Sequence, residues 1–292
     1  MPYPDPVGSR GAGLAALIAA PVKTVIAQRV VSLFNDRARG ERPVRRRPDG
    51  WFGPRSMAWQ VHGDVTAMMV GGIAGLLLQM LHPAVLAGVW DHSNFRQDMP
   101  GRLRRTARFI AQTTYGSPEE AQAAVDRVRA IHDRIGGVLP DGTAYAASDP
   151  TLLAWVHVTE TTCFLNSWLR YAAPGTSAAD QDRYIAEMAR IGVALGADPV
   201  PRSRAEAQAL VQAMRPRLRC DDRTREVARF LLTQRARSRA VQPFQTMAMH
   251  AAVDLLPDWA RVMHGLPSPV VSAPLVRAGT LGLAVAVRWA FR

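Results

Sequence analysis

The sequence predicts an all-α protein, a single large helical domain that encloses a pocket. Helix-start signals, in which a capping residue precedes proline or a glutamate, recur along the chain. Strand signals are nearly absent, because no stretch sustains the alternation of apolar and polar residues that a half-buried strand needs. The chain has 292 residues, of which 48% are hydrophobic and 21% are charged, so it can build a sizeable core and is not of the disordered class.

We expect three parts in the chain. Residues 1–50 form an N-terminal arm that ends in an exposed, arginine-rich linker interrupted by prolines. Residues 51–264 form the helical domain, and residues 265–292 form a C-terminal helix that is apolar and basic. That last segment either packs on the body or lies on a membrane, and the sequence leaves both open.

Two further apolar segments bear on location. Residues 11–22 have the length of a signal-peptide core, but the prolines and the acidic residue ahead of them make no convincing signal peptide. Residues 65–90 carry no formally charged residue and are long enough to span a bilayer. Gln79, His82 and Pro83 interrupt this run, which favours a buried helix broken at Pro83 over a membrane span. We therefore expect a cytoplasmic protein, at most peripheral to a membrane.

The charge balance is strongly basic. The net charge is +12, and 35 of the 36 positive residues are arginines. Such a charge attracts anionic surfaces, but the densest basic stretch, residues 202–239, offers only Phe230 for stacking on bases. A solvated helix surface is therefore favoured there, and nucleic acid is not an expected partner. Cys163 and Cys220 have neither zinc-site nor disulfide-framework spacing, which agrees with a reducing compartment.

A helix is predicted to begin at Pro118, because Ser117 and Glu120 form a capping box around that proline. Gly136 and Gly137 are predicted to end it. Its inward face is expected to comprise residues that recur at three- and four-residue intervals: Ala121, Ala124, Val125, Val128, Ile131, His132 and Ile135. The imidazole of His132 is therefore expected to face the interior.

Later helices are predicted from their first residues. The starts are Asp149-Pro150, Ser203 with Glu206 as a capping box, and Asp221-Asp222. The first of these helices is expected to run to about Tyr171 and to carry His157. Residues 141–145, with the sequence DGTAY, predict the one short hairpin or turn through their Asp-Gly pair.

Conventional catalytic motifs are scarce, so the histidines carry the chemical signal. There is no GxSxG elbow and no Walker loop, and the glycines of residues 71–75 do not have the spacing of a dinucleotide fingerprint. On spacing alone, His132 is either a core histidine or a metal or haem ligand. His157 and Glu160 lie three apart on one helical face, but the second half of a di-iron bundle motif is missing.

The segment GRLRRTARFI adds a cluster of hydrogen-bond donors. Arg102, Arg105 and Thr106 lie at positions i, i+3 and i+4, so all three project from one side of a helix. In a chain so rich in arginine, an ordinary surface cluster is one interpretation. The other is a cationic cluster that faces a buried pocket and holds anionic groups there.

Three motifs occur together in a fixed order: the run LLLQMLHP, the segment RLRRT and the triplet WVH. In combination they resemble the family of haem oxygenases that includes the latex-clearing rubber oxygenases and the MpaB-type oxygenase. The resemblance runs from about Trp59 to Arg170, and more faintly to Trp259. It implies an all-helical fold around a b-type haem and an attack by dioxygen on carbon–carbon double bonds of isoprenoid chains.

The resemblance also implies roles for particular residues. His132 matches the family's axial haem ligand, and Arg102, Arg105 and Thr106 match its distal-side segment. Arg105 replaces the family's lysine here, and because arginine stays charged, it cannot readily coordinate iron or release a proton. The sequence therefore leaves open whether Arg105 supports the oxygen chemistry of the family.

We expect a haem b-dependent oxygenase that uses dioxygen on an apolar, unsaturated, isoprenoid-like substrate. The expected catalytic residues are Arg102, Arg105 and Thr106, and the expected cofactor-binding residues are His132 as axial ligand, Arg102, His157 and His82. Met80, Leu81, His82 and Val85 are expected to line the substrate pocket. Two alternatives stay open, namely a non-catalytic haem-binding or haem-sensing protein, and an arginine-rich binder of anionic surfaces without a cofactor.

Overall fold

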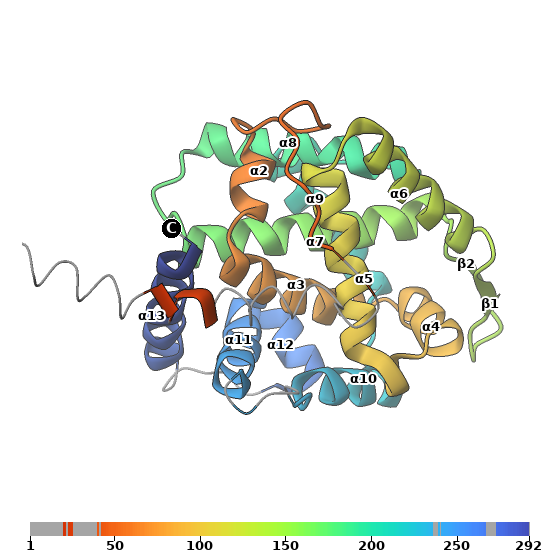
Figure 1. The fold of residues 1–292 in the computed structure, drawn as a ribbon. Coiled ribbons are helices and arrows are strands. Elements are labelled where there is room, and N and C mark those ends of the chain that lie inside the picture. The colour runs from red at the N-terminus through yellow and green to blue at the C-terminus, as the bar shows by residue number, and fades with distance from the viewer. Residues whose placement is uncertain are drawn as a thin grey trace, which may run out of the picture.

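The computed structural model is all-α, as predicted, with only a small two-stranded sheet among the described residues (Figure 1). It describes residues 20, 21, 23–25, 40, 42–235, 239, 241–266 and 273–291. Most of the predicted N-terminal arm, residues 1–50, lies outside these ranges, as does the predicted signal-peptide-like core. The division into three parts therefore stays a prediction.

The helices follow one another with short connections. In chain order the elements are α2 (Met57–His62), α3 (Val65–Gln79), α4 (Pro83–His92), α5 (Phe95–Tyr115), α6 (Pro118–His132), β1 (Gly136–Val138), β2 (Ala144–Ala146), α7 (Pro150–Tyr171), α8 (Ala178–Leu195), α9 (Arg204–Met214), the 3-10 turn η2 (Arg215–Arg217), α10 (Asp222–Leu232), α11 (Gln242–Leu255), α12 (Asp258–His264) and α13 (Ala273–Phe291).

The centre of the fold is α3 packed along α7, which runs across the middle of the molecule in Figure 1. Two glycines of α3 permit this close approach. A Cβ atom at Gly71 would lie 2.8 Å from the carbonyl oxygen of Cys163, and one at Gly75 would lie 3.5 Å from the Cα atom of Glu160. Any side chain at Gly71 would therefore push the two helices apart.

The apolar run of residues 65–90 is broken at Pro83, as predicted. α3 ends at Gln79, α4 begins at Pro83, and the two helices are bent by 104°. The Gln79 amide donates to the carbonyl of Val156 (3.3 Å), and the Trp155 indole donates to the carbonyl of Gln79 (3.4 Å). None of the described helices is by itself long and apolar enough to cross a membrane. The bent pair of α3 and α4 together is long and apolar enough, by length and composition only.

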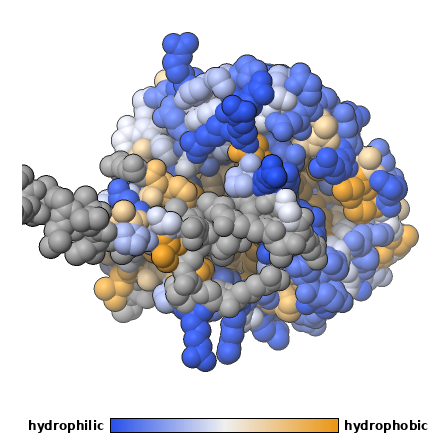
Figure 2. Space-filling model, in the orientation of Figure 1, coloured by the Kyte–Doolittle hydropathy of each residue, from blue (hydrophilic) through white to orange (hydrophobic). Residues whose placement is uncertain are grey.

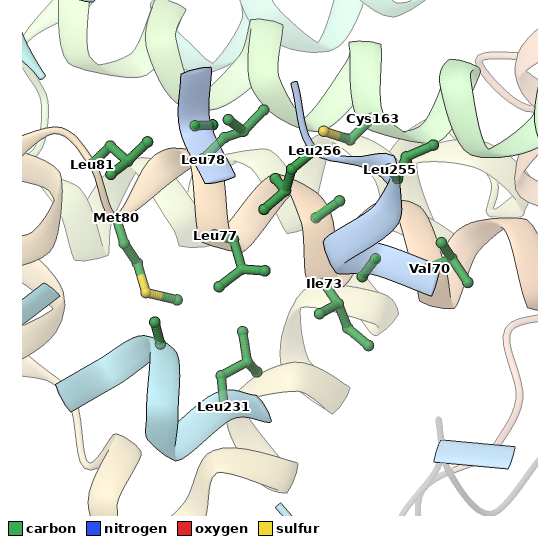
Figure 3. Close-up of a cluster of buried hydrophobic side chains, with 14 of the residues drawn as sticks. Val70, Ile73, Leu77, Leu78, Met80, Leu81, Cys163, Leu231, Leu255 and Leu256 are labelled. Carbon is green, nitrogen blue, oxygen red and sulfur yellow. The ribbon is translucent and has the colours of Figure 1, made fainter. Parts of the chain in front are cut away.

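The bend also decides where Met80 and Leu81 lie. Both are buried in the main hydrophobic core together with Leu77 and Leu231, a side chain of α10 (Figure 3). Neither is part of the lining of the cavity described below, because the chain turns after Gln79 and directs them into the core, and their place in a substrate pocket stays a prediction. They provide apolar burial that stabilises the fold.

The start of α6 confirms the predicted capping box. The Ser117 hydroxyl accepts from the amide of Glu120 (3.2 Å), and the Glu120 carboxylate accepts from the amide of Ser117 (2.9 Å). These two bonds satisfy amides that the first helical turn leaves without an intrahelical partner. They fix where α6 begins, and therefore the position along the helix axis of His132, its last residue.

The end of α6 differs from the prediction. The helix stops at His132, because the amides of Arg134 and Ile135 bond to carbonyls only three residues earlier and tighten the last turn. The glycines at 136 and 137 begin strand β1 instead. Ile131, expected on the inward face, is 45% exposed, since the inward side of this last turn centres on His132.

The other predicted starts are confirmed. Asp149 caps α7, Ser203 caps α9 and Asp221 caps α10, each by accepting from amides in the first turn. At α9 the capping box is incomplete, because the Glu206 carboxylate accepts from the amide of Arg202 (2.8 Å) instead of Ser203. The predicted hairpin is also present: β1 and β2 pair antiparallel around a turn that contains the Asp-Gly pair.

The C-terminal helix α13 lies against α11 and α3. Arg277 of α13 donates to Asp254 of α11 (2.8 Å), and Arg288 donates to Asp64 (2.6 Å). Both carboxylates are almost fully buried. One of the two outcomes that the sequence left open, a final helix packed on the body, is therefore present.

Candidate active site

A cavity lies between α5, α6, α7 and α8, and its lining is mainly apolar. It encloses about 50 Å³, which is room for a few water molecules. The apolar lining residues are Phe109, Ile110, Leu153, Val156, Phe164, Met188, Ile191 and Leu195. The lining residues with polar side chains are His62, Thr113, His132, His157 and Glu160. Few polar groups in apolar surroundings are typical of a ligand site.

His62 is the polar lining residue whose hydrogen bonds are complete. Its Nδ1 atom lies 2.7 Å from the hydroxyl of Thr114, and its Nε2 atom lies 3.0 Å from the hydroxyl of Tyr184. Burial lowers the pKa of His62 to about 3, so the ring is neutral. With both nitrogens bonded, His62 is held in place and has no nitrogen left for a ligand.

His132 is the last residue of α6 and differs from His62 in its bonding. Its Nδ1 atom is buried and has no hydrogen-bond partner within the part of the chain that the structure describes. Burial lowers the pKa of His132, against an opposing effect of the neighbouring Asp133. A neutral imidazole with a nitrogen left without a partner is what a metal ion or a polar ligand requires.

His157 projects from the middle of α7 and contacts α8. A Cβ atom at Gly192 would lie 3.0 Å from the His157 ring, so the ring occupies the space that a side chain there would need. Burial lowers the pKa of His157 to about 4. The sequence named His132 and His157 as cofactor contacts, and the structure brings both to one cavity.

Glu160 lies one turn after His157 and is the lining residue that sequence reasoning missed as a site residue. Its carboxyl group takes part in no hydrogen bond or ion pair among the described residues, and burial raises its pKa to about 7. The H-x-x-E spacing of His157 and Glu160 is visible in the sequence, but by itself it indicates only half of a di-iron motif. In the described ranges no three His, Cys, Asp or Glu side chains are grouped to hold a metal ion.

Arg102 lies on the same side of α5 as the cavity-lining residues Phe109 and Thr113, which follow it at intervals of about two and three turns. The burial of Arg102 lowers the pKa of its guanidinium, and the nearby charge of Arg105 lowers it further. Among the described residues the Arg102 side chain has no anionic partner. An unpaired cation that is partly removed from water is suited to bind an anionic group.

Arg105 and Thr106 lie at the outer side of α5. The Arg105 guanidinium is 56% exposed and lies 3.5 Å from the Asp98 carboxylate and 3.5 Å from the side-chain oxygen of Asn94. The hydroxyl of Thr106 donates to the carbonyl of Arg102 (3.4 Å). Neither side chain is part of the cavity lining. Their catalytic roles stay predictions.

His82 is separate from the cavity. It precedes α4 as its N-cap, is buried, and burial lowers its pKa to about 4 with a further contribution from the charge of Arg217. Its Nδ1 atom has no hydrogen-bond partner in the described ranges. The structure does not place it beside His132 and His157, and its role as a cofactor contact stays a prediction.

An iron porphyrin fits the donor chemistry of this cavity, but the enclosed volume is too small for it. The imidazole of His132, whose Nδ1 atom has no hydrogen-bond partner among the described residues, lies among apolar side chains and is the kind of donor that a haem uses. A space of about 50 Å³ is well below the roughly 300–1,000 Å³ of ligand pockets. A porphyrin would therefore require the side chains that line the cavity to move apart.

Comparison with known proteins identifies the family. Residues 59–289 match the family model described as ER-bound oxygenase mpaB/B'/Rubber oxygenase, catalytic domain. None of the curated proteins and none of the solved structures matches the chain. The matched residues include all those that line the cavity and nearly all of α13. The resemblance carried by the LLLQMLHP, RLRRT and WVH motifs is thereby confirmed, and the chain belongs to the mpaB and rubber oxygenase catalytic-domain family.

Proposed function

We propose that the protein is a haem b-dependent oxygenase, an oxidoreductase that uses dioxygen on an apolar, unsaturated substrate of isoprenoid type. The family is an oxygenase catalytic domain, which supports oxygen chemistry. The observation that carries the haem assignment is the buried Nδ1 atom of His132, which lies in an apolar cavity and has no hydrogen-bond partner among the described residues. A cytoplasmic location is part of the proposal.

His132 holds the cofactor in this proposal. Burial lowers its pKa, so at neutral pH the ring is uncharged and offers a lone pair to iron. When bound, the haem supplies the activation of dioxygen. His157, which is also uncharged because burial lowers its pKa to about 4, packs in the same cavity and fixes the position of α8 beside it.

Arg102 binds an anionic edge of the cofactor in this proposal. Arg102 lies outside the cavity lining, on the side of α5 that carries Phe109 and Thr113, and its guanidinium has no anionic partner among the described residues. A carboxylate there would gain a charge-assisted, two-pronged hydrogen bond. Arg105 stays charged beside Asp98, so it orients anionic groups and does not deliver protons.

Glu160 holds or moves a proton within the cavity. Its pKa of about 7 leaves a mixture of the protonated and ionised forms near neutral pH, so either oxygen can donate or accept. The apolar side chains around it, such as Phe164 and Met188, exclude water and favour an apolar substrate. The chain therefore provides a dry site with a single titrating carboxyl group.

Oxygen uptake by the haem-loaded protein tests the proposal. We expect faster uptake with squalene, which has isolated double bonds, than with squalane, its saturated counterpart, and a product whose mass has increased by oxygen. Runs with and without an added reductant settle whether one is needed. A protein that binds haem but consumes no oxygen with either hydrocarbon would instead be the non-catalytic haem-binding protein.

A further inference from the structure

The outer side of α13 carries an unusual number of exposed apolar side chains. Leu275 is 76% exposed, Val285 62%, Leu281 43% and Trp289 40%. Leu281, Val285 and Trp289 recur every four residues and so lie on one side of the helix. In Figure 2 hydrophobic residues gather at the side of the molecule where Figure 1 places α13. A contiguous apolar patch of this kind marks an interaction surface.

The charges of α13 lie along one edge of this patch. The helix contains no acidic residue, and its arginines within the described range are Arg277 and Arg288. They lie four positions before and seven positions after Leu281, and so on the same side of the helix as that residue. Arg277 pairs with Asp254 and Arg288 pairs with Asp64, and the Arg277 side chain stays 48% exposed. The apolar patch is therefore bordered by two paired cations on its Leu281 side.

A cation from the N-terminal part of the chain lies beside the same face. The ammonium of Lys23 lies 5.0 Å from the ring centroid of Trp289. In the sequence, Lys23 directly follows the apolar run of residues 11–22. Val25, two residues later, is 48% exposed. A positive charge thus lies at the Trp289 end of the patch.

We propose that the outer face of α13 docks on an anionic lipid bilayer. An apolar helix face with tryptophan and phenylalanine at one end is suited to lie in the plane of a membrane interface. The net charge of +12 attracts acidic headgroups, whereas it opposes the approach of a second, equally charged copy. The proposal does not depend on the presence of haem or on oxygenase activity.

Vesicle flotation of the full chain tests this. We expect the wild-type protein to float with vesicles of phosphatidylcholine and phosphatidylglycerol, to bind pure phosphatidylcholine less, and to bind less in high salt. Leu275→Glu with Val285→Glu should lower binding to the anionic vesicles at least about tenfold. Both positions are more than half exposed, so the fold should tolerate the change. If circular dichroism shows that the glutamate double variant is unfolded, Leu275→Ser with Val285→Ser is tested in its place.

The matched control is Val138→Glu with Val193→Glu. Val138 lies in β1 and is 64% exposed, and Val193 lies in α8 and is 56% exposed. The two substitutions add the same negative charge as the pair in α13. This control should bind within about twofold of wild type. Absence of wild-type binding at low salt, or equal losses in both double variants, would overturn the proposal. So would a dimer that the α13 variant converts to a monomer while no chain binds vesicles, because a second copy would then be the occupant.

Discussion

At the scale of single residues, burial sets the charge of the cavity. The three imidazoles of His62, His132 and His157 are neutral because burial lowers each pKa, and Glu160 is largely protonated below its raised pKa of about 7. Below neutral pH the cavity thus carries little charge, which suits an apolar ligand.

Glu160→Gln should change the pH dependence of stability. Because the folded-state pKa of Glu160 lies above the ordinary glutamate value of 4.5, the folded state holds the proton more tightly, and wild-type stability falls as pH rises from about 4.5 to 7. The stability of the Glu160→Gln variant does not decrease in this way. Relative to wild type it should therefore gain about 3 kcal/mol across this window, and no more above it.

Urea denaturation at a series of pH values measures this difference. The buried histidines, whose pKa values burial lowers, destabilise both proteins alike as pH falls below about 6.5, so their effect cancels in the comparison. A difference between the two proteins that stays constant with pH would contradict the assigned environment of Glu160.

Gly192→Ala should disturb His157. The added Cβ would lie 3.0 Å from the imidazole ring, and such overpacking costs about 1–3 kcal/mol. Gly282→Ala in α13 is the control, because nothing lies within 4 Å of its Cβ position and alanine favours a helix by up to about 1 kcal/mol. Thermal unfolding should rank the control at or above wild type and Gly192→Ala below it. Equal midpoints would show that His157 does not need that space.

At the scale of helices, the sequence predicted where the helices begin better than it predicted which of their faces are buried. The caps at Ser117, Asp149 and Asp221 are confirmed, because a cap is a contact between residues three or fewer positions apart. The exposed Ile131 and the core position of Met80 were not predicted. Which side of a turn is buried depends on the helices that pack against it, and those are distant in the sequence.

The attachment of α13 should depend on Asp254. This buried carboxylate accepts from Arg170 and Arg277, so Asp254→Ala leaves two guanidiniums unpaired and should cost about 2 kcal/mol. Hydrogen exchange across α13 should accelerate. Glu226→Ala breaks only the exposed pair with Arg96, and should cost at most about 1 kcal/mol and leave exchange in α13 unchanged. Similar exchange in both variants would refute an anchoring role for Asp254.

At the scale of the whole molecule, the fold class and the family could be predicted, and the site only in part. His132 and His157 were both named and share one cavity, since each lies on the inward side of a well-capped helix. The other named residues, His82, Arg102, Arg105 and Thr106, are not part of the cavity lining. The spacing of a motif shows which residues share one face of a helix. It does not show which other helix packs against that face. Glu160 was missed because an unpaired carboxyl is recognisable only from its burial.

Haem binding tests the central claim most directly. Purified protein should show a Soret band and a stoichiometric haem content in the pyridine haemochrome assay. His132→Ala should lose haem while its circular dichroism stays unchanged, and His92→Ala, which removes an exposed imidazole bonded to the carbonyl of Gly136, should keep it. A wild-type chain that binds no haem, or a His132→Ala variant with full occupancy and an unaltered spectrum, would contradict the account.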